Sequence, residues 1–575
     1  MHVQKLIFLV IICIFIDCSN CFRDDVVKDL YPYPRLIQYS DEYQYGPDCV
    51  LVEHNMNALV FNNDSIWSKK EMNSIRLFYR NLYKDFRKLD SDSFSAIPTF
   101  QLLKIELIKF PVMSKQDYDD SFNDTVPFGA NEYYDLRIFK DAVTIYSHSK
   151  FGVYQALKTM ASLSLVYQDT FCVKYIPFRI QDQPRFKYRG LLLDTGRSYF
   201  SIDSIKEIIR GLSLLRYNVL HWHLVDDQSF SMEMLDEFLQ DLHLKGAYHL
   251  GYIHNQIPIT KGKFYTQKEI KSVVRYAEER GIRVIPEIDL PGHARSWDVA
   301  YKLGAQCPMF MKSTRYNSVN LEYTYSIPLD ISRNYTVNVI QGVLKEIVNL
   351  FTDPLIHLGG DEVDIRCWAE DKEMQKRMEE LGYTSPTTYI DYFKKILKDI
   401  KHTILVNKTV IQWEDILSPM DITKDSHTIY QLWKGDDSLK QLKEKKSRFI
   451  YSFGNYLDPS YQSCQTFEKC YNQSKLLELE KNFPNQFIGV EACAWEMIEQ
   501  DNVQSLESNG LDKVERSFND TVWYKLIAIS EKLWTQPMHQ LPSNISLYLK
   551  RAQIQTLKLS HIISIGNKTI SRVTL

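Results

Sequence analysis

The sequence predicts an α/β protein: a (β/α)8 TIM barrel preceded by a small α+β domain. Three observations support this fold class. Eight short apolar segments recur after residue 185, helix-like stretches separate several of them, and the 575 residues are about four times the ~150 residues of one domain. Near-continuous apolar strands that alternate with helices are typical of a parallel sheet covered by helices, and eight repeats match a closed barrel.

The chain begins with a segment typical of a secretory signal peptide. Lys5 precedes an apolar run at 6–16, and small or polar residues follow it up to Cys21. A membrane anchor is the less favoured alternative, because a helix of this length extends only about 16 Å against a ~30 Å hydrocarbon core. We expect residues 1–21 to be removed, the mature chain to carry no membrane span, and the protein to be lysosomal or secreted.

Residues 22–184 are expected to form the α+β domain. Segments 135–139 and 143–147 are predicted strands, and the apolar residues of 151–167 recur at helical spacing. We place the domain boundary at Pro184, because the residue before a proline is disfavoured in the helical region.

Residues 185–575 are expected to hold the barrel and a C-terminal helical extension. The eight predicted strands are 188–194, 218–225, 282–288, 355–358, 410–413, 429–433, 449–453 and 487–495. The helix-like stretches between them include 205–215, 266–280, 335–351 and 387–400. A doubly wound open sheet is the alternative, but the GxGxxG signature of a dinucleotide site is absent after the first strand.

Charge and cysteine content restrict the class of protein further. The 69 Lys and Arg nearly balance the 72 Asp and Glu, and the positive residues form no long run, so a nucleic-acid partner is not predicted. Seven cysteines follow residue 21. An oxidising compartment would pair some of them, although spacing does not fix the pairs and an odd number leaves at least one thiol free. Cys464 and Cys470, six residues apart, are candidates for a small local ring.

Eight Asn-x-Ser/Thr sequons follow the signal peptide and predict a glycoprotein. They are at Asn63, Asn123, Asn334, Asn407, Asn472, Asn519, Asn544 and Asn567.

Carboxylates and imidazoles gather where the first four predicted strands end. They include Asp194, His221, His223, Asp226, Asp227, Glu287, Asp289, His293, His357, Asp361 and Glu362, and Arg197 lies among them. Any one of them alone is as well explained as a helix cap or a satisfied buried polar group. Active sites of such barrels lie at the C-terminal strand ends, so the whole set indicates an active site there.

The segment 357–364, HLGGDEVD, is the most informative of these strand ends. Its two glycines allow a sharp turn, after which the adjacent carboxyls of Asp361 and Glu362 emerge at the barrel mouth. Adjacent residues do not flank a glycosidic bond at the ~5 to 9 Å used by two-carboxylate glycosidases. A substrate that carries its own nucleophile, such as a 2-acetamido oxygen, fits this pair: one carboxyl protonates the leaving group and its neighbour holds the acetamido N–H.

Nine motifs together carry a family resemblance over nearly the whole chain. They are YPYPR (31–35), RGLLLDTGR (189–197), NVLHWHLVDDQSF (218–230), PGH (291–293), HLGGDEVD (357–364), WED (413–415), YLD (456–458), EACAW (491–495) and SEKLW (530–534). They resemble those of family 20 glycoside hydrolases, the β-N-acetylhexosaminidases, and most closely the eukaryotic lysosomal and secreted branch. The resemblance implies a retaining exo-glycosidase that removes terminal β-linked N-acetylglucosamine or N-acetylgalactosamine from glycans, without a cofactor or a metal, and implies a homodimer.

The resemblance also implies catalytic roles. Glu362 resembles the general acid/base, and we expect enclosure and the neighbouring carboxylate to raise its pKa. Asp361 resembles the residue that orients the acetamido group and balances the positive charge of an oxazolinium ion. Asp226 and His293 resemble the pair that supports Glu362.

Further residues resemble the family's substrate contacts. Arg197 resembles a ligand of sugar hydroxyls, Tyr456 a donor to the acetamido oxygen, and Asp458 a hydroxyl contact at the rim. The walls of the acetamido pocket are implied to be Trp413, Trp433 and Trp495. Ordinary barrel core is the alternative for Trp413 and Trp433, and a surface loop for Tyr456 and Asp458. Cys307 and Cys367 resemble a family disulfide, with reduced thiols as the alternative.

Two positions depart from the family pattern. Met497 stands where the family has an acidic residue that contacts a distal hydroxyl, so either Glu496 points into the pocket or the preference between glucosamine and galactosamine changes. Asn455 stands where a tryptophan usually precedes the tyrosine, which predicts a more open rim. Asp458 favours neutral substrates, because its carboxylate would repel a 6-sulfate.

Two other functions stay open. His221 and His223 point to the same strand face and, with His293, His357 and Asp361 nearby, are compatible with a metal-dependent amidohydrolase. A catalytically impaired carbohydrate-binding protein on the same scaffold is the second alternative, for which Met497 and Asn455 are the reason.

Overall fold

The structure is a computed structural model, and it describes only part of the chain. The described residues are 34–39, 50–53, 55–62, 67–86, 103–110, 130–167, 170–173, 177–248, 262–308, 327–417, 428–458, 464, 467–471, 474–495, 515, 518–535, 552 and 563. The predicted signal peptide lies outside them, as do Glu496 and Met497.

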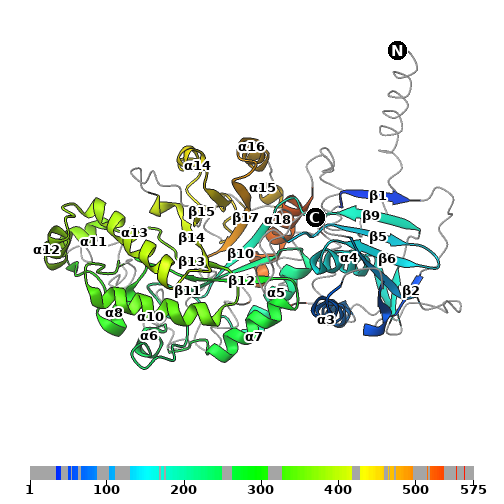
Figure 1. Ribbon diagram of the computed structural model, residues 1–575, viewed down its shortest axis with the longest axis horizontal. Helices are drawn as coiled ribbons and strands as arrows, with labels where there is room; N and C mark the ends of the chain where they lie inside the picture. The colour runs from blue at the N-terminus through cyan, green and yellow to red at the C-terminus, as the bar shows by residue number, and fades with distance from the viewer. Residues whose placement is uncertain are drawn as a thin grey trace, which may run out of the picture.

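Eight parallel strands close into a barrel, which confirms the predicted fold class (Figure 1). The strands are β10 (Tyr188–Asp194), β11 (Val219–Val225), β12 (Arg283–Ile288), β13 (Leu355–His357), β14 (Thr409–Trp413), β15 (Thr428–Leu432), β16 (Arg448–Tyr451) and β17 (Phe487–Ala494). Each strand pairs with the next, and β10 pairs with β17 to close the circle. All eight predicted strands are therefore confirmed, each within two residues at either end.

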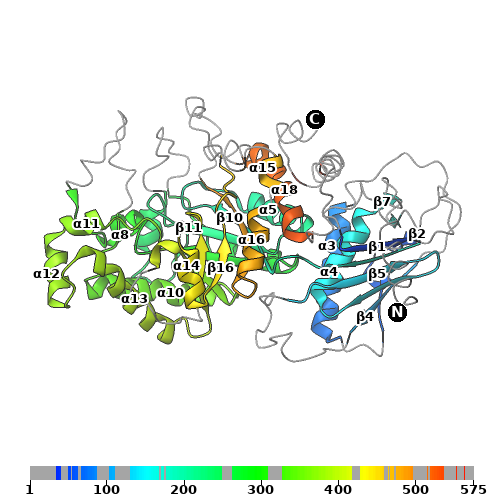
Figure 2. The same cartoon turned by 90° about the horizontal axis from the view of Figure 1, so that it is seen from above.

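The barrel interior explains why its strands are apolar. Eight buried side chains, one from each strand, pack together inside the barrel. They are Tyr188, Val219, Ile285, Leu355, Ile411, Ile429, Ile450 and Ile488. Helices cover the outer face of the strands (Figure 2), so both faces are buried and the strands are mostly apolar.

The helices between the strands include the four that the periodicity predicts. The longer ones are α5 (Ile202–Leu214), α7 (Gln267–Glu278), α10 (Asn334–Leu350), α12 (Lys372–Glu380), α13 (Pro386–Thr403) and α16 (Ser474–Asn482). The shorter ones are α6 (Asp241–Gly246), α8 (Arg295–Tyr301), α11 (Ile365–Glu370), η5 (Glu414–Ile416), α14 (Leu439–Lys445) and α15 (Phe467–Tyr471). Helix α18 (Trp523–Trp534) follows the last strand. Thr266 and Glu269 form a capping box at the start of α7, which explains where that helix begins.

The N-terminal region is an α+β unit with two sheets. Its elements are β1 (Leu36–Tyr39), β2 (Val50–Val52), η2 (Met56–Ala58), β3 (Leu59–Phe61), α3 (Lys69–Phe86), β4 (Ile105–Lys109), β5 (Tyr134–Ile138), β6 (Val143–Ser147), α4 (Lys150–Ser162), β7 (Ser164–Tyr167), β8 (Thr170–Val173) and β9 (Phe178–Asp182). The larger sheet has the order β1-β9-β5-β6-β4-β3, and β2, β8 and β7 form the smaller one. Helices α3 and α4 lie on the side of the larger sheet that faces the barrel (Figures 1 and 2).

The predicted helix at 151–167 is wrong at its C-terminal end. Helix α4 ends at Ser162, and residues 164–167 form β7, which pairs antiparallel with β8. A short apolar run is compatible with both the helical and the strand period of apolar residues. Here pairing with β8 decides that it forms a strand.

Buried polar contacts join the N-terminal unit to the barrel. The Arg189 guanidinium donates to Glu132 at 2.8 Å, and the Arg216 guanidinium donates to Thr159 of α4 at 2.6 Å. Arg189 and Arg216 lie at the N-terminal ends of barrel strands, opposite the end at which the active site is predicted.

Two disulfides are described in full. Cys307 pairs with Cys367, as the resemblance implied, and Cys464 pairs with Cys470 to close the small ring. Cys172 is also disulfide-bonded, and Cys493 is a free, buried thiol.

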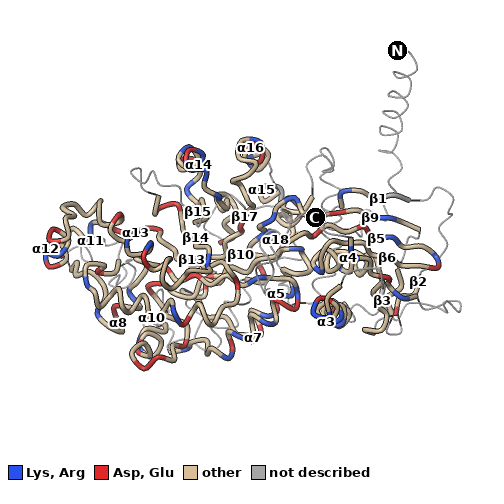
Figure 3. Tube along the Cα trace, in the orientation of Figure 1, with Lys and Arg blue, Asp and Glu red and all other residues tan. Residues whose placement is uncertain are grey.

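Surface features bear on the remaining sequence predictions. Asn334 and Asn407 are exposed and Asn519 is half-buried, whereas the other five predicted glycosylation sites lie outside the described residues. Acidic and basic residues are interspersed on surface helices such as α12 and α16 (Figure 3). In the described part of the chain, the helices are too short or too polar to cross a membrane.

Candidate active site

The C-terminal ends of the barrel strands bring the predicted site residues together. Arg197, Asp226, His293, Asp361 and Glu362 follow β10 to β13, and ion pairs connect them. Trp413, Trp433, Tyr456 and Trp495 follow or end β14 to β17 and form one cluster with Leu192 and Cys493. The mouth therefore has an ionisable half and an aromatic half.

Two glycines place the carboxyls of Asp361 and Glu362. Gly359 has a φ of +58°, and a Cβ there would lie 1.8 Å from Oδ1 of Asp289. The backbone N–H of Gly360 donates to the same Asp289 oxygen at 2.9 Å. Only glycine allows β13 to pass this close to the end of β12, so the HLGGDE sequence directs both carboxyls into the mouth.

His293 is the centre of the ionisable half. Its Nδ1 lies 3.3 Å from Asp226 and 3.5 Å from Asp227, while its Nε2 lies 3.7 Å from Asp361 and 3.5 Å from Glu362. Burial alone would lower the pKa of His293, but the Asp226 charge and these hydrogen bonds outweigh it and raise the pKa well above its usual value. His293 is therefore an imidazolium that faces both candidate catalytic carboxyls.

Asp226 supplies the negative charge that balances His293. Its Oδ2 lies 2.9 Å from the Arg197 guanidinium and accepts from His223 Nε2 at 2.9 Å. Burial alone would raise the pKa of Asp226, but Arg197 and His293 hold the pKa well below its usual value. Arg197 also lies 5.2 Å above the Trp495 ring, where it connects the two halves of the mouth.

The carboxyl of Asp361 is easier to protonate than an ordinary aspartate. Burial raises its pKa to about 6, although the His293 charge opposes this shift. Burial and the Asp361 charge raise the pKa of Asp289 well above its usual value, and the Asp289 contact in turn partly offsets the rise in the pKa of Asp361.

Glu362 differs from the sequence-based expectation. Its pKa is lowered rather than raised, because its side chain accepts a hydrogen bond from His293 and feels the charges of His293 and Arg197. The side chain is 55% exposed, so burial offsets this only in part. The expectation assumed an enclosed carboxyl, whereas here the imidazolium stabilises its anion.

The aromatic half forms a compact apolar wall. The ring of Trp413 lies 5.9 Å from that of Trp495, and the Tyr456 ring lies 6.4 Å from Trp495. Trp413 is fully buried, Tyr456 is 7% exposed, and Trp433 and Trp495 are partly buried. Asp458 is also buried, after Tyr456 on the same loop. These rings offer flat apolar surface at the barrel mouth.

Asp415 joins the two halves at the surface. Its Oδ2 accepts from the Trp433 indole N–H at 2.8 Å, and its Oδ1 accepts from the backbone N–H of Glu362 at 3.3 Å. Lys434 forms an ion pair with the same carboxylate. Asp415 belongs to the WED motif, but the motif alone did not indicate this role.

Glu287 joins the two halves inside the barrel. Its Oε1 accepts from the Trp413 indole N–H at 2.8 Å, and its Oε2 pairs with His223 Nδ1 at 2.6 Å. His223 in turn contacts Asp226, so hydrogen bonds and ion pairs run from Trp413 to His293. Glu287 and His223 were recognised as strand-end residues but not as connectors, because their partners come from other strands.

The family described as glycosyl hydrolase family 20, catalytic domain, matches residues 186–537, which include the whole barrel. The chain belongs to glycosyl hydrolase family 20.

Relatives of this family 20 chain include eukaryotic hexosaminidases. Beta-hexosaminidase 1 of Arabidopsis thaliana is 28% identical over 553 residues, covering 94% of this chain and 92% of the relative. Beta-hexosaminidase subunit beta of Rattus norvegicus is 30% identical over 519 residues, covering 88% and 86%. The family resemblance inferred from the sequence is confirmed.

Solved structures show the same fold. The family 20 exo β-N-acetylglucosaminidase of Vibrio harveyi, in complex with N-acetylglucosamine, has a TM-score of 0.70 at 22% identity and covers 93% of this chain and 77% of its own. The chitobiase of Flavobacterium johnsoniae has a TM-score of 0.68 at 24% identity and covers 93% and 73%.

Two clusters of this family 20 site lie close enough to share an ion. They are His221, Glu287 and His357, and His293, Asp361 and Glu362. Burial alone would lower the pKa of His221, but Glu491 and Glu287 raise it to about 9. A metal at the first cluster would have to displace a proton from His221, which disfavours the metal hypothesis at neutral pH.

Asn455 is 3% exposed, and its side chain accepts a hydrogen bond from Lys532 of α18. The more open rim expected from this residue stays a prediction. Met497 lies outside the described residues, so its effect on sugar preference stays a prediction.

Proposed function

We propose that this family 20 enzyme removes terminal β-linked N-acetylglucosamine and N-acetylgalactosamine from glycans with retention, and that the 2-acetamido oxygen of the substrate is its nucleophile. One observation carries the proposal: both carboxyls of the Asp361–Glu362 pair face Nε2 of His293, on one side of the mouth. The aromatic cluster forms the other side. An internal nucleophile needs an acid and an orienting group on one side and a pocket for its acyl group on the other.

Glu362 is the proposed proton donor to the glycosidic oxygen. Its exposed carboxyl lies at the surface of the mouth, where a leaving group departs to solvent. A sugar bound over it would exclude water and disfavour the carboxylate, which opposes the pull of His293 and raises the pKa. After aglycone departure, the Glu362 carboxylate takes a proton from the water that opens the ring intermediate.

Asp361 is the proposed partner of the acetamido N–H. With a pKa of about 6, its carboxylate form predominates above that pH and accepts the hydrogen bond from this N–H. The same negative charge balances the oxazolinium ion that forms when the acetamido oxygen attacks the anomeric carbon. Asp289 then serves to hold Asp361 in place.

The aromatic residues are the proposed acetamido pocket. Trp413, Trp433 and Trp495 enclose the methyl group and exclude water, while the Tyr456 hydroxyl donates to the acetamido oxygen. Arg197 and Asp458 are the proposed contacts of the sugar hydroxyls. The Asp458 carboxylate disfavours a 6-sulfated sugar.

Compartment, domain limits and assembly belong to the same proposal. A signal peptide at 1–21, the sequons and the disulfides support a secretory-pathway protein that is lysosomal or secreted. We keep the boundary at Pro184 and the homodimer as proposals that follow from the sequence and the family.

Hydrolysis of aryl β-N-acetylglucosaminide and β-N-acetylgalactosaminide from pH 4 to 8, with EDTA present, tests this function. Turnover that survives EDTA and collapses in Glu362→Gln supports it, and the ratio of the two substrates measures sugar preference. Loss of turnover in EDTA would favour a metal-dependent hydrolase. Binding of chito-oligosaccharides without turnover would favour a carbohydrate-binding protein.

A further inference from the structure

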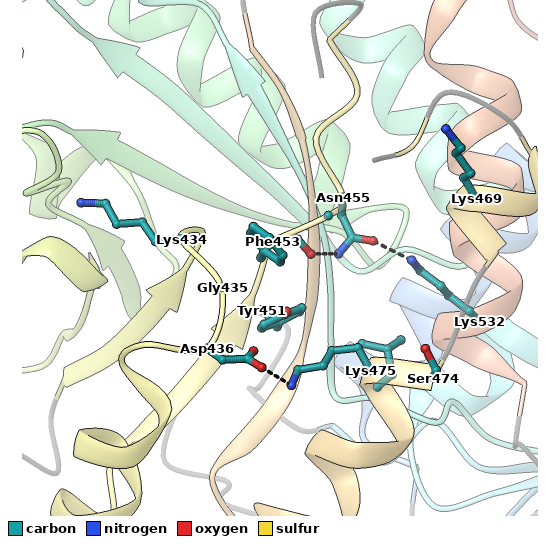
Figure 4. Close-up of a pocket in the computed structure, with 12 residues that line it drawn as sticks. Lys434, Gly435, Asp436, Tyr451, Phe453, Asn455, Lys469, Ser474, Lys475 and Lys532 are labelled. Atoms are coloured by element: carbon teal, nitrogen blue, oxygen red, sulfur yellow. Dashed lines mark hydrogen bonds and ion pairs between the residues drawn. The ribbon is translucent and has the colours of Figure 1, made fainter. Parts of the chain in front are cut away.

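The loop that carries Tyr456 borders an open cavity on one side. The cavity has a volume of about 510 Å³, and Phe453, Gly454 and Asn455 line it on the loop side (Figure 4). Lys469 and Lys532 are among the residues on its far side. Tyr456 and Leu457 pack against the core, but packing does not hold the side of the loop that faces the cavity.

The barrel holds one edge of this loop through backbone hydrogen bonds. The N–H of Leu457 donates to the carbonyl of Cys493 on β17 at 2.8 Å, and the N–H of Cys493 donates to the carbonyl of Asn455 at 3.1 Å. These bonds fix the backbone along β17 but leave the outer edge of the loop to other partners.

Two buried lysines of α18 hold the outer edge. Lys525 Nζ donates to the carbonyl of Leu457 at 2.7 Å, and Lys532 Nζ donates to Oδ1 of Asn455 at 2.6 Å. The lysines are two helical turns apart and so lie on one face of α18. Their acceptors are the residues immediately before and after Tyr456. Figure 4 shows the Lys532 contact reaching the loop from α18.

Burying a lysine amine is unfavourable unless hydrogen bonds compensate for the water that it loses. Lys525 and Lys532 are 3% and 4% exposed. Burial, reinforced by the charge of Arg185, lowers the pKa of Lys532 to about 7. Apolar side chains would fill the same positions on α18 without this penalty.

We propose that Lys525 and Lys532 are positioning residues that hold the Tyr456 hydroxyl where the acetamido oxygen arrives. This inference rests on the proposed function, since it takes Tyr456 as the acetamido ligand. The lysines touch no substrate. They act through Asn455 and Leu457, and a small shift of the loop lengthens the Tyr456 hydrogen bond in the transition state.

A double-mutant cycle tests the proposal. Lys532→Met is expected to lower kcat on aryl β-N-acetylglucosaminide about tenfold with little change in KM. In a Tyr456→Phe background the same substitution is expected to lower kcat less than twofold, because the hydroxyl it positions is gone. Lys532→Arg keeps a donor and is expected to restore most of kcat. Lys440→Met, at an exposed position of α14, is the matched control and is expected to match wild type.

The outcomes separate this inference from the proposed function. An equal loss from Lys532→Met in the wild-type and Tyr456→Phe backgrounds would mean that Lys532 is merely structural, and would overturn the positioning role while leaving the enzyme intact. A Tyr456→Phe variant with full kcat would overturn both the acetamido role of Tyr456 and the positioning role. If Lys532→Met does not fold, Asn455→Ala removes the acceptor from the loop side, and the same cycle with Tyr456→Phe gives the same decision.

Discussion

The two halves of the barrel mouth are built from different chemistry. Strands β10 to β13 end in ionisable groups that share protons and charge through His293. Strands β14 to β17 end in aromatic rings that pack on one another. One half perturbs pKa values, and the other presents apolar surface.

This difference assigns each half a separate task. Proton transfer needs groups whose charges are coupled, whereas an internal nucleophile needs a dry pocket that fixes its angle of attack. The halves are not independent, because Asp415 and Glu287 each accept hydrogen bonds from a tryptophan of one half and contact a residue of the other.

Loss of the acid in the ionisable half should give the largest effect. Glu362→Gln is expected to lower kcat by about 10²- to 10⁴-fold for substrates with poor leaving groups. A 2,4-dinitrophenyl aglycone needs little protonation as it leaves, so Glu362→Gln should lower kcat far less for this substrate. Stopped assays with a graded series of aryl aglycones measure this dependence. An equal loss for every aglycone would contradict the acid role.

Asp361 should set the acidic limb of the pH profile. Its pKa of about 6 means that it becomes protonated as the pH falls below that value, so kcat/KM should fall there. Asp361→Asn is expected to lower kcat by about 10²- to 10³-fold and to remove this limb. The measurement is kcat/KM from pH 4 to 8 for both proteins. If the acidic limb persists unchanged in Asp361→Asn, a group other than Asp361 is responsible for it.

Loss of the Asp415 carboxylate, which connects the two halves, should lower kcat by a smaller factor. Asp415→Asn weakens the bonds to the Trp433 indole and the Glu362 backbone, and we expect about a tenfold fall in kcat. Asp437→Asn, exposed in the turn after β15, is the matched control. The measurement is kcat of both variants from steady-state kinetics. Equal kcat values would show that Asp415 does not connect the halves.

Removing the disulfides should lower the free energy of unfolding instead of kcat, and by a different amount on each side of the mouth. Cys307 and Cys367 are 60 residues apart on the ionisable side, whereas Cys464 and Cys470 are six apart between β16 and β17. In the chain-entropy model, replacing each pair by serine reduces the free energy of unfolding by about 4 and about 2 kcal/mol. Denaturant unfolding measures both. A larger loss for the short ring would contradict this order.

The barrel was predictable because each strand is buried on both faces. Segments such as 188–194 are largely apolar along their length, and no helical period competes with that pattern. The end of α4 was not predictable in the same way, because residues 165–167 are apolar in either conformation and only their pairing with β8 makes them a strand.

The site was predictable in its residues but not in its electrostatics. Motifs located Asp361, Glu362 and the tryptophans, because each follows a recognisable strand. The direction of the Glu362 pKa depends on the distance to His293, which comes from a different strand. The roles of Asp289, Glu287 and Asp415 likewise depend on partners that are far away in the sequence.

The nucleophile is proposed to belong to the substrate, and successive fluorination of the substrate's acetyl group distinguishes it from a nucleophile of the protein. Aryl β-glucosaminides that carry N-acetyl, N-fluoroacetyl, N-difluoroacetyl and N-trifluoroacetyl groups offer progressively weaker acyl oxygens at nearly constant size. We predict that kcat/KM falls steeply along this series. A flat series would contradict the account, because a nucleophile supplied by the protein would not sense the acyl oxygen.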